Sequence, residues 1–237
     1  MSDNYFYENN ILRYEFLNDE FTNDLYQEFD LKGNKLGLDS KIEDLLSGEI
    51  VNFTENKAAL HPKYRKNNGY IEEANQYQHM DVDELIDNFN LNDDALNNFL
   101  DINLHSAEAV VVIGIGGSYE GPKLLIESLG SEETQRQILF ITGSDKTEFN
   151  EKLKNLNPKT TQFIVSSKSF TTDETIKTLK DAIHWSGDTN NFLAITANKA
   201  EAQKFNIKNI AEFDDAIGGR YSIWSKISFP AYLYMPL

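Results

Sequence analysis

The sequence contains no cysteine, and this absence excludes several kinds of site at once. A disulfide framework, a thiolate nucleophile and a zinc or iron–sulfur site with cysteine ligands all require thiols. Histidine is also scarce, with 4 in 237 residues, so a metal ion would have to be held by carboxylates or by these scattered side chains. No residue pattern indicates a metal site, and we expect none.

Positive charge is in short supply. The chain carries 22 lysines and arginines against 38 acidic residues, which gives a formal net charge of −16. Such a chain repels nucleic acids and anionic membrane surfaces, so we expect neither as a partner. No stretch approaches the roughly 18 apolar residues of a membrane span, and the first ten residues lack the basic start and apolar core of a signal peptide. We therefore expect a cytoplasmic protein.

Two parts of the chain differ in pattern, although no linker rich in Pro, Gly or Ser separates them. Residues 1–105 are polar, rich in Asn, Asp and Glu, and contain short amphipathic runs with acidic starts, typical of helices. We expect a helical N-terminal region there and a second domain over residues 106–237. The predicted helices of the first part are 40–46, 82–89 and 94–100.

The second part alternates short apolar runs with longer amphipathic segments, which is typical of βαβ units around a buried parallel sheet. We therefore expect a doubly wound, mostly parallel α/β sheet flanked by helices, with ligands at the carboxyl ends of its strands. The predicted strands are 109–113, 137–141, 162–165, 192–196 and, more weakly, 209–213. The predicted helices are 119–129, 145–155, 172–185 and 200–205.

A glycine-rich loop, 114–118, follows the first of these strands and precedes a helix. Glycines allow a ligand to approach the backbone, and the N–H groups of a helix start suit an anion such as phosphate. A dinucleotide fingerprint would need glycine where Tyr119 stands, and a P-loop is excluded by the sequence of 121–123. Asp145 could still contact a ribose, so a nucleotide remains an alternative, as does a tight turn without a ligand.

A second loop, 167–174, crowds four hydroxyl groups and Lys168 at a predicted helix start. Hydroxyls donate to phosphate oxygens, and the helix dipole and the ammonium favour an anion. The alternative is a capping box formed by Thr171 and Glu174. That motif explains two of these residues and leaves the others without a role.

The third loop contains Gly218, Gly219 and Arg220, and two acidic residues precede it. An always-charged, planar guanidinium beside two glycines suits a substrate oxygen or a developing oxyanion. The alternative is a surface ion pair of Arg220 with Asp214 or Asp215.

Taken together, four separated blocks resemble the N-terminal half of the glucose-6-phosphate isomerase (phosphoglucose isomerase) family. They are GEIVNFTENKAALH (48–61), VVIGIGGSYEGPKLL (111–125), SKSFTTDETIKTLKDA (167–182) and FDDAIGGRYSIWS (213–225). The resemblance implies a sugar-isomerase domain that acts on glucose 6-phosphate and fructose 6-phosphate in glycolysis and gluconeogenesis. It also implies a homodimer for the full-length family and no cofactor.

The resemblance assigns roles to matching positions. Arg220 would be catalytic and would stabilise the enediolate-like intermediate of an aldose–ketose proton transfer. The residues that would contact the sugar phosphate are Gly117, Ser118, Ser167, Lys168, Ser169, Phe170, Thr171 and Thr172.

The resemblance places the family's catalytic Glu, His and Lys beyond the fourth block. Glu120, Glu174 and Glu212 do not match the base, and the four histidines match none of the catalytic histidines. We therefore expect an N-terminal portion that is inactive alone, because enolisation requires a positioned base. The alternative is a regulatory module that binds a sugar phosphate without catalysis. Lys226 departs from the family pattern, in which a small residue follows Ser225. The run 227–237 is almost wholly apolar, and exposed apolar ends promote association.

Overall fold

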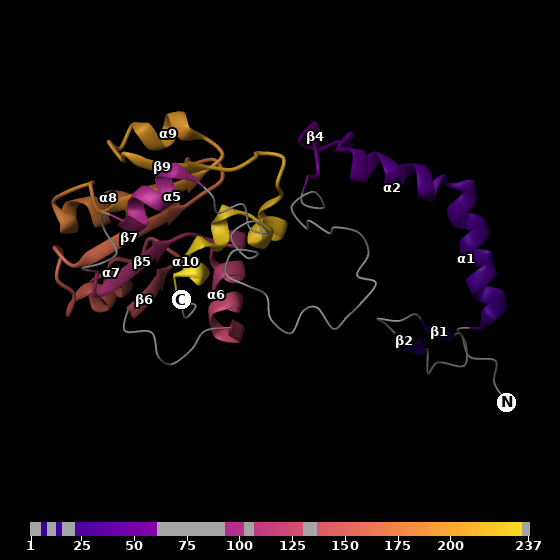
Figure 1. Cartoon of the computed structure of the whole chain (residues 1–237), viewed down its shortest axis with the longest axis horizontal. Coiled ribbons are helices and arrows are strands. Elements are labelled where there is room, and N and C mark those ends of the chain that lie inside the picture. Colours follow the sequence, from indigo (N-terminus) through magenta and orange to yellow (C-terminus); the bar gives the residue numbers. More distant parts are fainter. Residues whose placement is uncertain are drawn as a thin grey trace. The chain divides into compact units, whose positions relative to one another are not determined.

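The structure is a computed structural model that describes residues 6–8, 13–15, 22–60, 93–101, 107–129 and 137–233. The chain divides into two compact units, Met1–Asp81 and Val82–Leu237 (Figure 1). The short helix α5 (Asp94–Phe99) belongs to the second unit because it packs against the sheet there. A domain boundary after residue 105 stays a prediction, and the predicted helix 82–89 lies outside the described residues.

Two helices dominate the described part of the first unit. The second of them contains the predicted helix 40–46. Thr22 caps the first helix with its side chain, and Gly37 adopts the left-handed conformation (φ 64°) that turns the chain into the second. Neither helix contains a buried residue among those described. The elements are α1 (Asn23–Lys35), α2 (Leu38–Ser47) and the antiparallel pairs β1 (Phe6–Glu8) with β2 (Arg13–Glu15) and β3 (Ile50–Asn52) with β4 (Lys57–Ala58).

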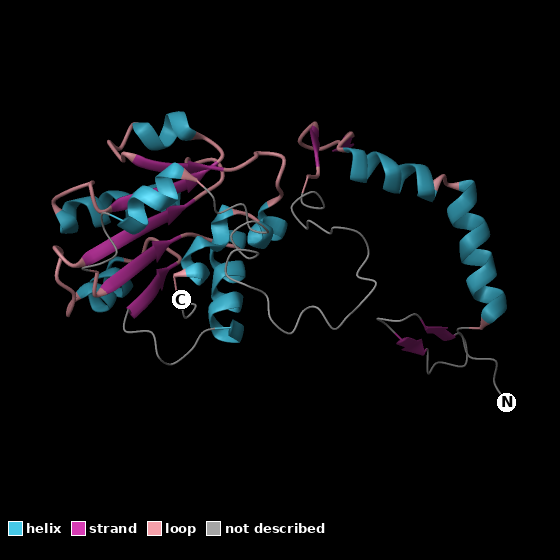
Figure 2. Cartoon of the chain, viewed as in Figure 1, coloured by secondary structure: helices cyan, strands magenta, loops and turns pink. Residues whose placement is uncertain are grey.

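The second unit is built on a five-stranded parallel sheet, whose strands Figure 2 draws as magenta arrows. The strands lie in the order β6-β5-β7-β8-β9. Every residue of the three central strands is buried, as expected for apolar runs in a parallel sheet covered on both faces. All five predicted strands are confirmed. Their bounds are β5 Ala109–Ile113, β6 Gln137–Ile141, β7 Thr161–Ser166, β8 Phe192–Thr196 and β9 Asn209–Glu212.

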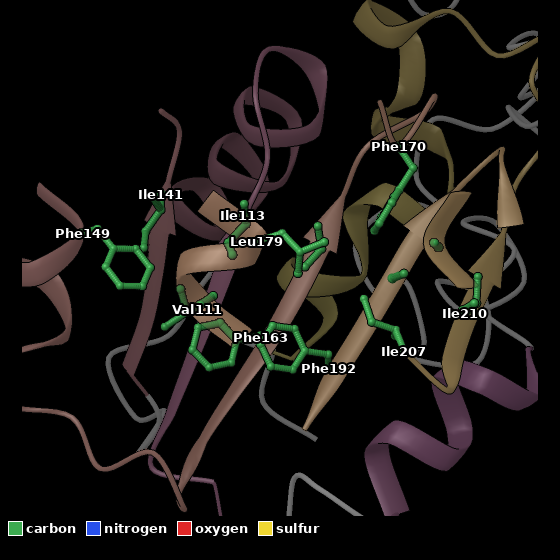
Figure 3. Close-up of a cluster of buried hydrophobic side chains, with 14 of the residues drawn as sticks. Val111, Ile113, Ile141, Phe149, Phe163, Phe170, Leu179, Phe192, Ile207 and Ile210 are labelled. Atoms are coloured by element: carbon green, nitrogen blue, oxygen red, sulfur yellow. The ribbon is translucent and has the colours of Figure 1, made fainter. Parts of the chain in front are cut away.

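One face of the sheet carries an apolar core (Figure 3). Alternate residues of β5 and β7, including Val111 and Phe163, pack there against Leu179 and other helix side chains. The ring of Phe163 also stacks on Phe192, with centroids 4.6 Å apart. The helices that supply this face are α7 (Lys146–Leu153), α8 (Asp173–Ser186) and α9 (Lys199–Gln203).

A second helical group contributes nothing to that core cluster. Helix α6 packs against the three short helices that end the described chain, and Phe99 of α5 contacts Phe229 edge to face at 6.3 Å. The apolar run is largely covered as far as it is described, since Ile227 and Phe229 are no more than 1% exposed. The bounds are α6 Gly117–Leu129, η3 Gly219–Trp224, η4 Lys226–Ser228 and α10 Phe229–Tyr232.

The strand order contains a topological switch point. The chain passes from β5 to β6 on one side and then places β7 on the other side of β5. Ligands of doubly wound sheets bind beside such a point, at the carboxyl ends of the strands. The predicted α/β fold class is therefore confirmed. The four predicted helices are α6 to α9, and none of their ends differs from the prediction by more than two residues.

Candidate functional site

The first two predicted loops meet at the switch point. Ile113, the last residue of β5, is paired with Val165 of β7, so Gly114 leaves the sheet beside Ser166, the last residue of β7. A Cβ atom added to Gly114 would lie 3.1 Å from the carbonyl oxygen of Ser166. This tight approach brings the glycine loop and the hydroxyl-rich loop to one edge of the sheet.

The glycine loop also touches the third loop. Gly116 has φ 58°, a left-handed conformation that glycine adopts at little cost, and α6 begins at the next residue. A Cβ atom on Gly117 would lie 1.8 Å from the carbonyl oxygen of Gly219, so no other residue fits there without displacing backbone. Gly121, one turn later, lies close to Ile223: a Cβ atom added there would lie 3.1 Å from the Cβ atom of Ile223. The structure thus brings all three loops together.

Backbone hydrogen bonds from β8 fix the hydroxyl-rich loop, which we call the serine loop (residues 167–172). The N–H of Ser167 donates to the carbonyl oxygen of Ile195 (3.0 Å). The carbonyl oxygen of Lys168 accepts from the N–H of Ala197 (3.0 Å) and from the hydroxyl of Thr196 (3.1 Å). The loop therefore continues the strand pairing past the end of the sheet.

Phe170 has a structural role in this loop. Its φ of 54° is unusual for a bulky residue, and the left-handed turn redirects the chain into α8. Its ring is 1% exposed and packs near the ring of Phe205, with centroids 6.0 Å apart. Its N–H donates to the hydroxyl oxygen of Ser167 (3.2 Å). The side chain predicted to contact a ligand therefore lies in the core, and only its backbone borders the loop.

Three hydroxyl groups lie at the exposed side of the serine loop. Thr171 donates from its hydroxyl to that of Ser169 (2.9 Å), which leaves the proton of Ser169 available to another acceptor. Thr172 is the N-cap residue of α8, yet its side chain makes no capping hydrogen bond. The capping box of Thr171 with Glu174 is not formed at this helix start. These hydroxyls and the dipole of a 14-residue helix face the same end of the sheet.

The third loop, residues 213–225, presents Arg220 to solvent and will be called the arginine loop. Asp214 accepts the N–H of Ala216 (2.9 Å) with its side chain and shapes a turn. Within the described residues, neither Asp214 nor Asp215 forms an ion pair with Arg220. The surface ion pair considered from the sequence is therefore not formed, and the guanidinium is available to an anion.

Two residues near the carboxyl ends of the strands were not predicted from the sequence as part of this region. Ser166 is 0% exposed and its hydroxyl has no hydrogen-bond partner in the described part of the chain. Lys226, noted only as a departure from a pattern, is 8% exposed and forms an ion pair with Asp93 at 2.6 Å. Ser166 lies in a strand and Lys226 directly before an apolar run, and no sequence motif marks either position.

Lys123 is the lysine considered above for a P-loop. Its hydrogen-bond partner lies one turn earlier in the same helix, α6. Its ammonium donates to the hydroxyl of Tyr119 (2.8 Å), and this hydrogen bond raises the pKa of Lys123 above its usual value. Across the described ranges, no cluster of three or more acidic or histidine residues could hold a metal ion. None of the described helices is long and apolar enough to span a membrane.

Comparisons with known proteins point in one direction. Residues 15–236 match the family model described as phosphoglucose isomerase. The chain is 34% identical over 218 residues to a glucose-6-phosphate isomerase of Methylococcus capsulatus and 35% identical over 219 residues to one of Shewanella sediminis. Each alignment covers 83% of this chain, and they cover 39% and 38% of the two relatives. The chain thus spans about two fifths of the length of these curated relatives.

A solved structure agrees with the sequence relatives. The crystal structure of a glucose-6-phosphate isomerase from Chlamydia trachomatis D/UW-3/Cx matches with a TM-score of 0.62 and 25% sequence identity. The match covers 83% of this chain and 39% of that chain.

Proposed function

Because this chain belongs to the phosphoglucose isomerase family, we propose that it supplies the substrate-binding part of an isomerase that interconverts glucose 6-phosphate and fructose 6-phosphate. The observation that carries the proposal is the meeting of three loops at one sheet edge. Gly117 touches Gly219, and Gly114 touches Ser166, so hydroxyls, helix N-termini and Arg220 surround one place on an otherwise acidic chain.

The phosphate group is assigned to the serine loop. The hydroxyls of Ser169, Thr171 and Thr172 donate to phosphate oxygens, and the N-terminus of α8 adds its positive dipole. Ser167 accepts a hydrogen bond from Phe170 and keeps its own proton for the ligand. The rigid backbone of this loop matters here, because donors that are already in place lose little entropy when they bind.

The sugar end is assigned to the other two loops. Gly117 and Ser118 lie at the start of α6 and would contact the sugar. The end of the sugar that carries C1 and C2 would reach Arg220 in η3. During aldose–ketose isomerisation a proton moves between C1 and C2, and negative charge develops on the adjacent oxygens. A guanidinium that stays charged at all working pH values stabilises this enediolate-like state.

No described residue is assigned as the base that moves the proton. Enolisation needs a base within hydrogen-bond reach of the carbon acid, and binding alone cannot replace it. We therefore expect these 237 residues to bind the sugar phosphate without turning it over. A coupled isomerase assay checks this expectation, and clear turnover by this polypeptide would contradict it.

Calorimetric titration with glucose 6-phosphate tests the binding site. The wild-type chain should bind saturably, and Arg220→Met should weaken binding about tenfold or more, since hydrogen bonds to charged groups contribute about 1.5–3 kcal/mol. The unfolding midpoint should stay unchanged because Arg220 is exposed. Lys208→Met is the matched control: it removes one exposed charge next to the amino end of β9, at the opposite edge of the sheet. Absence of saturable wild-type binding, or equal affinity of Arg220→Met, would refute the proposal.

A further inference from the structure

The two residues that flank the arginine loop, Glu212 and Lys226, contact each other. The loop departs after Glu212, the last residue of β9, and ends at Lys226, the first residue of η4. The ammonium of Lys226 donates to the carbonyl oxygen of Glu212 (2.8 Å). One side chain therefore closes the loop at its base.

The same ammonium is anchored to a distant segment. It forms an ion pair with Asp93 at 2.6 Å, across 133 positions of sequence. The other oxygen of Asp93 accepts the N–H groups of Ala95 (2.8 Å) and Leu96 (3.2 Å), so this carboxylate also caps α5. Leu96 is 0% exposed. Lys226 is thus tied to a helix that is fixed in the core.

Two further supports of the arginine loop come from outside it: the N–H of Phe213 donates to the carbonyl oxygen of Thr196 (3.1 Å), and η3 packs against α6. Two hydrogen bonds within the loop are short-range. Ser222 donates to the carbonyl oxygen of Gly219 (2.7 Å), and Ser225 donates to that of Ser222 (2.6 Å). These bonds shape η3 and do not connect it to the sheet. Outside the loop, Gly219 meets Gly117 backbone to backbone. A change at the base of the loop would therefore move Gly219 and Arg220 relative to the glycine loop.

We propose that Lys226 is a positioning residue that fixes Arg220 by clamping the base of the arginine loop to Glu212 and Asp93. The inference rests on the proposed function for its effect on ligand binding. Its structural part, the closure of the loop, does not depend on the ligand.

The test removes the ion pair without leaving a buried charge. Replacing one partner would strand the other, whereas Lys226→Met with Asp93→Asn removes both charges, and the amide oxygen still caps α5. In this double variant, amide hydrogen exchange over residues 214–222 should quicken about tenfold, and affinity for glucose 6-phosphate should fall about tenfold. Exchange in β5 and β7 should stay at wild-type rates.

Two further variants make the result decisive. Asp93→Asn alone keeps the hydrogen bond of Lys226 to Glu212 but loses the one to position 93, because the amide oxygen caps α5 and the amide nitrogen cannot accept from the ammonium. We expect about a threefold change in exchange and in affinity. Lys199→Met is the matched control, because Lys199 contacts the side chain of Glu212 (3.1 Å) at the surface and does not close the loop. It should leave both measurements unchanged.

The outcomes separate this inference from the proposed function. Wild-type exchange over 214–222 in both Asp93 variants would overturn the clamp. If the wild-type chain binds glucose 6-phosphate and faster exchange leaves affinity unchanged, Lys226 is not a positioning residue. If the wild-type chain binds no glucose 6-phosphate, the proposed function fails, and the exchange rates still decide whether Lys226 closes the loop.

Discussion

The serine loop and the arginine loop, the two sides of the proposed site, are held in different ways. The serine loop extends the pairing of β7 with β8 through backbone hydrogen bonds at Ser167 and Lys168. Among the hydrogen bonds of the described residues, the arginine loop is paired with β8 only at its first residue, where the N–H of Phe213 donates to the carbonyl oxygen of Thr196 (3.1 Å). Beyond that it packs on α6 through its glycine contact and is closed by the side chain of Lys226. Backbone pairing tolerates changes of side chain, whereas packing and a single ammonium do not. Substitutions should therefore disturb the arginine loop more readily than the serine loop.

The largest effect is expected from Gly117→Ala. The new Cβ atom would lie 1.8 Å from the carbonyl oxygen of Gly219, and backbone cannot yield as a flexible side chain does. We expect a loss of about 3 kcal/mol in the free energy of unfolding, at the upper end of the usual cost of overpacking. Urea denaturation measures it. Binding of glucose 6-phosphate should also be lost, because the arginine loop must move.

Gly143→Ala is the control for this prediction. Gly143 also follows a strand, β6, but a Cβ atom there meets nothing within 4 Å. Its free energy of unfolding should change by less than about 0.5 kcal/mol, as for other substitutions that disturb no contact. Equal stability of the two alanine variants would contradict the account of the arginine loop, because the contact of Gly117 with Gly219 would then not hold that loop in place.

A smaller effect is expected from Thr196→Val in the support of the serine loop. The change removes the hydroxyl that donates to Lys168 (3.1 Å) and accepts the N–H of Asn198 (3.0 Å), but the N–H of Ala197 still donates to the carbonyl oxygen of Lys168. The loss should be about 1–3 kcal/mol in the free energy of unfolding, with affinity for glucose 6-phosphate within about threefold of wild type. Denaturation and calorimetry on one preparation measure both.

Thr161→Val provides the matched threonine change at the other end of the sheet. Thr161 starts β7 and donates from its hydroxyl to the carbonyl oxygen of Asn157 (2.9 Å). It should cost about 1 kcal/mol in the free energy of unfolding, for one hydrogen bond, and leave affinity unaltered. A tenfold loss of affinity in Thr196→Val would show that the serine loop also depends on a side chain, against the contrast drawn between the loops.

Much of the sheet could be predicted because parallel strands buried on both faces are continuous apolar runs. The run 109–113 needed no tertiary information to be recognised, and the same holds for 192–196. The position of the serine loop was predictable for a related reason: its hydroxyl residues and the helix that follows them are adjacent in sequence. Its binding of phosphate stays a prediction. These features are local in sequence and are decided by local physical chemistry.

Features that depend on distant partners could not be predicted. The burial of Phe170 follows from its left-handed turn and from Phe205, neither of which the motif shows. Lys226 gains its role from Asp93 and Glu212, which no periodicity connects to it. The 3-10 helix η3 was expected as loop, because its first residues are glycine and arginine and its support comes from α6. The way the arginine loop is held is therefore a property of the fold.

Amide chemical-shift mapping with glucose 6-phosphate tests the central claim that all three loops bind one ligand. The account predicts saturable shifts at Gly117 and Ser118, over residues 167–172 and at Arg220, with a single apparent affinity. Amides at the amino ends of the strands, such as Ala109 and Asn209, should not shift. Shifts confined to one loop, or none at saturating sugar phosphate, would contradict the account.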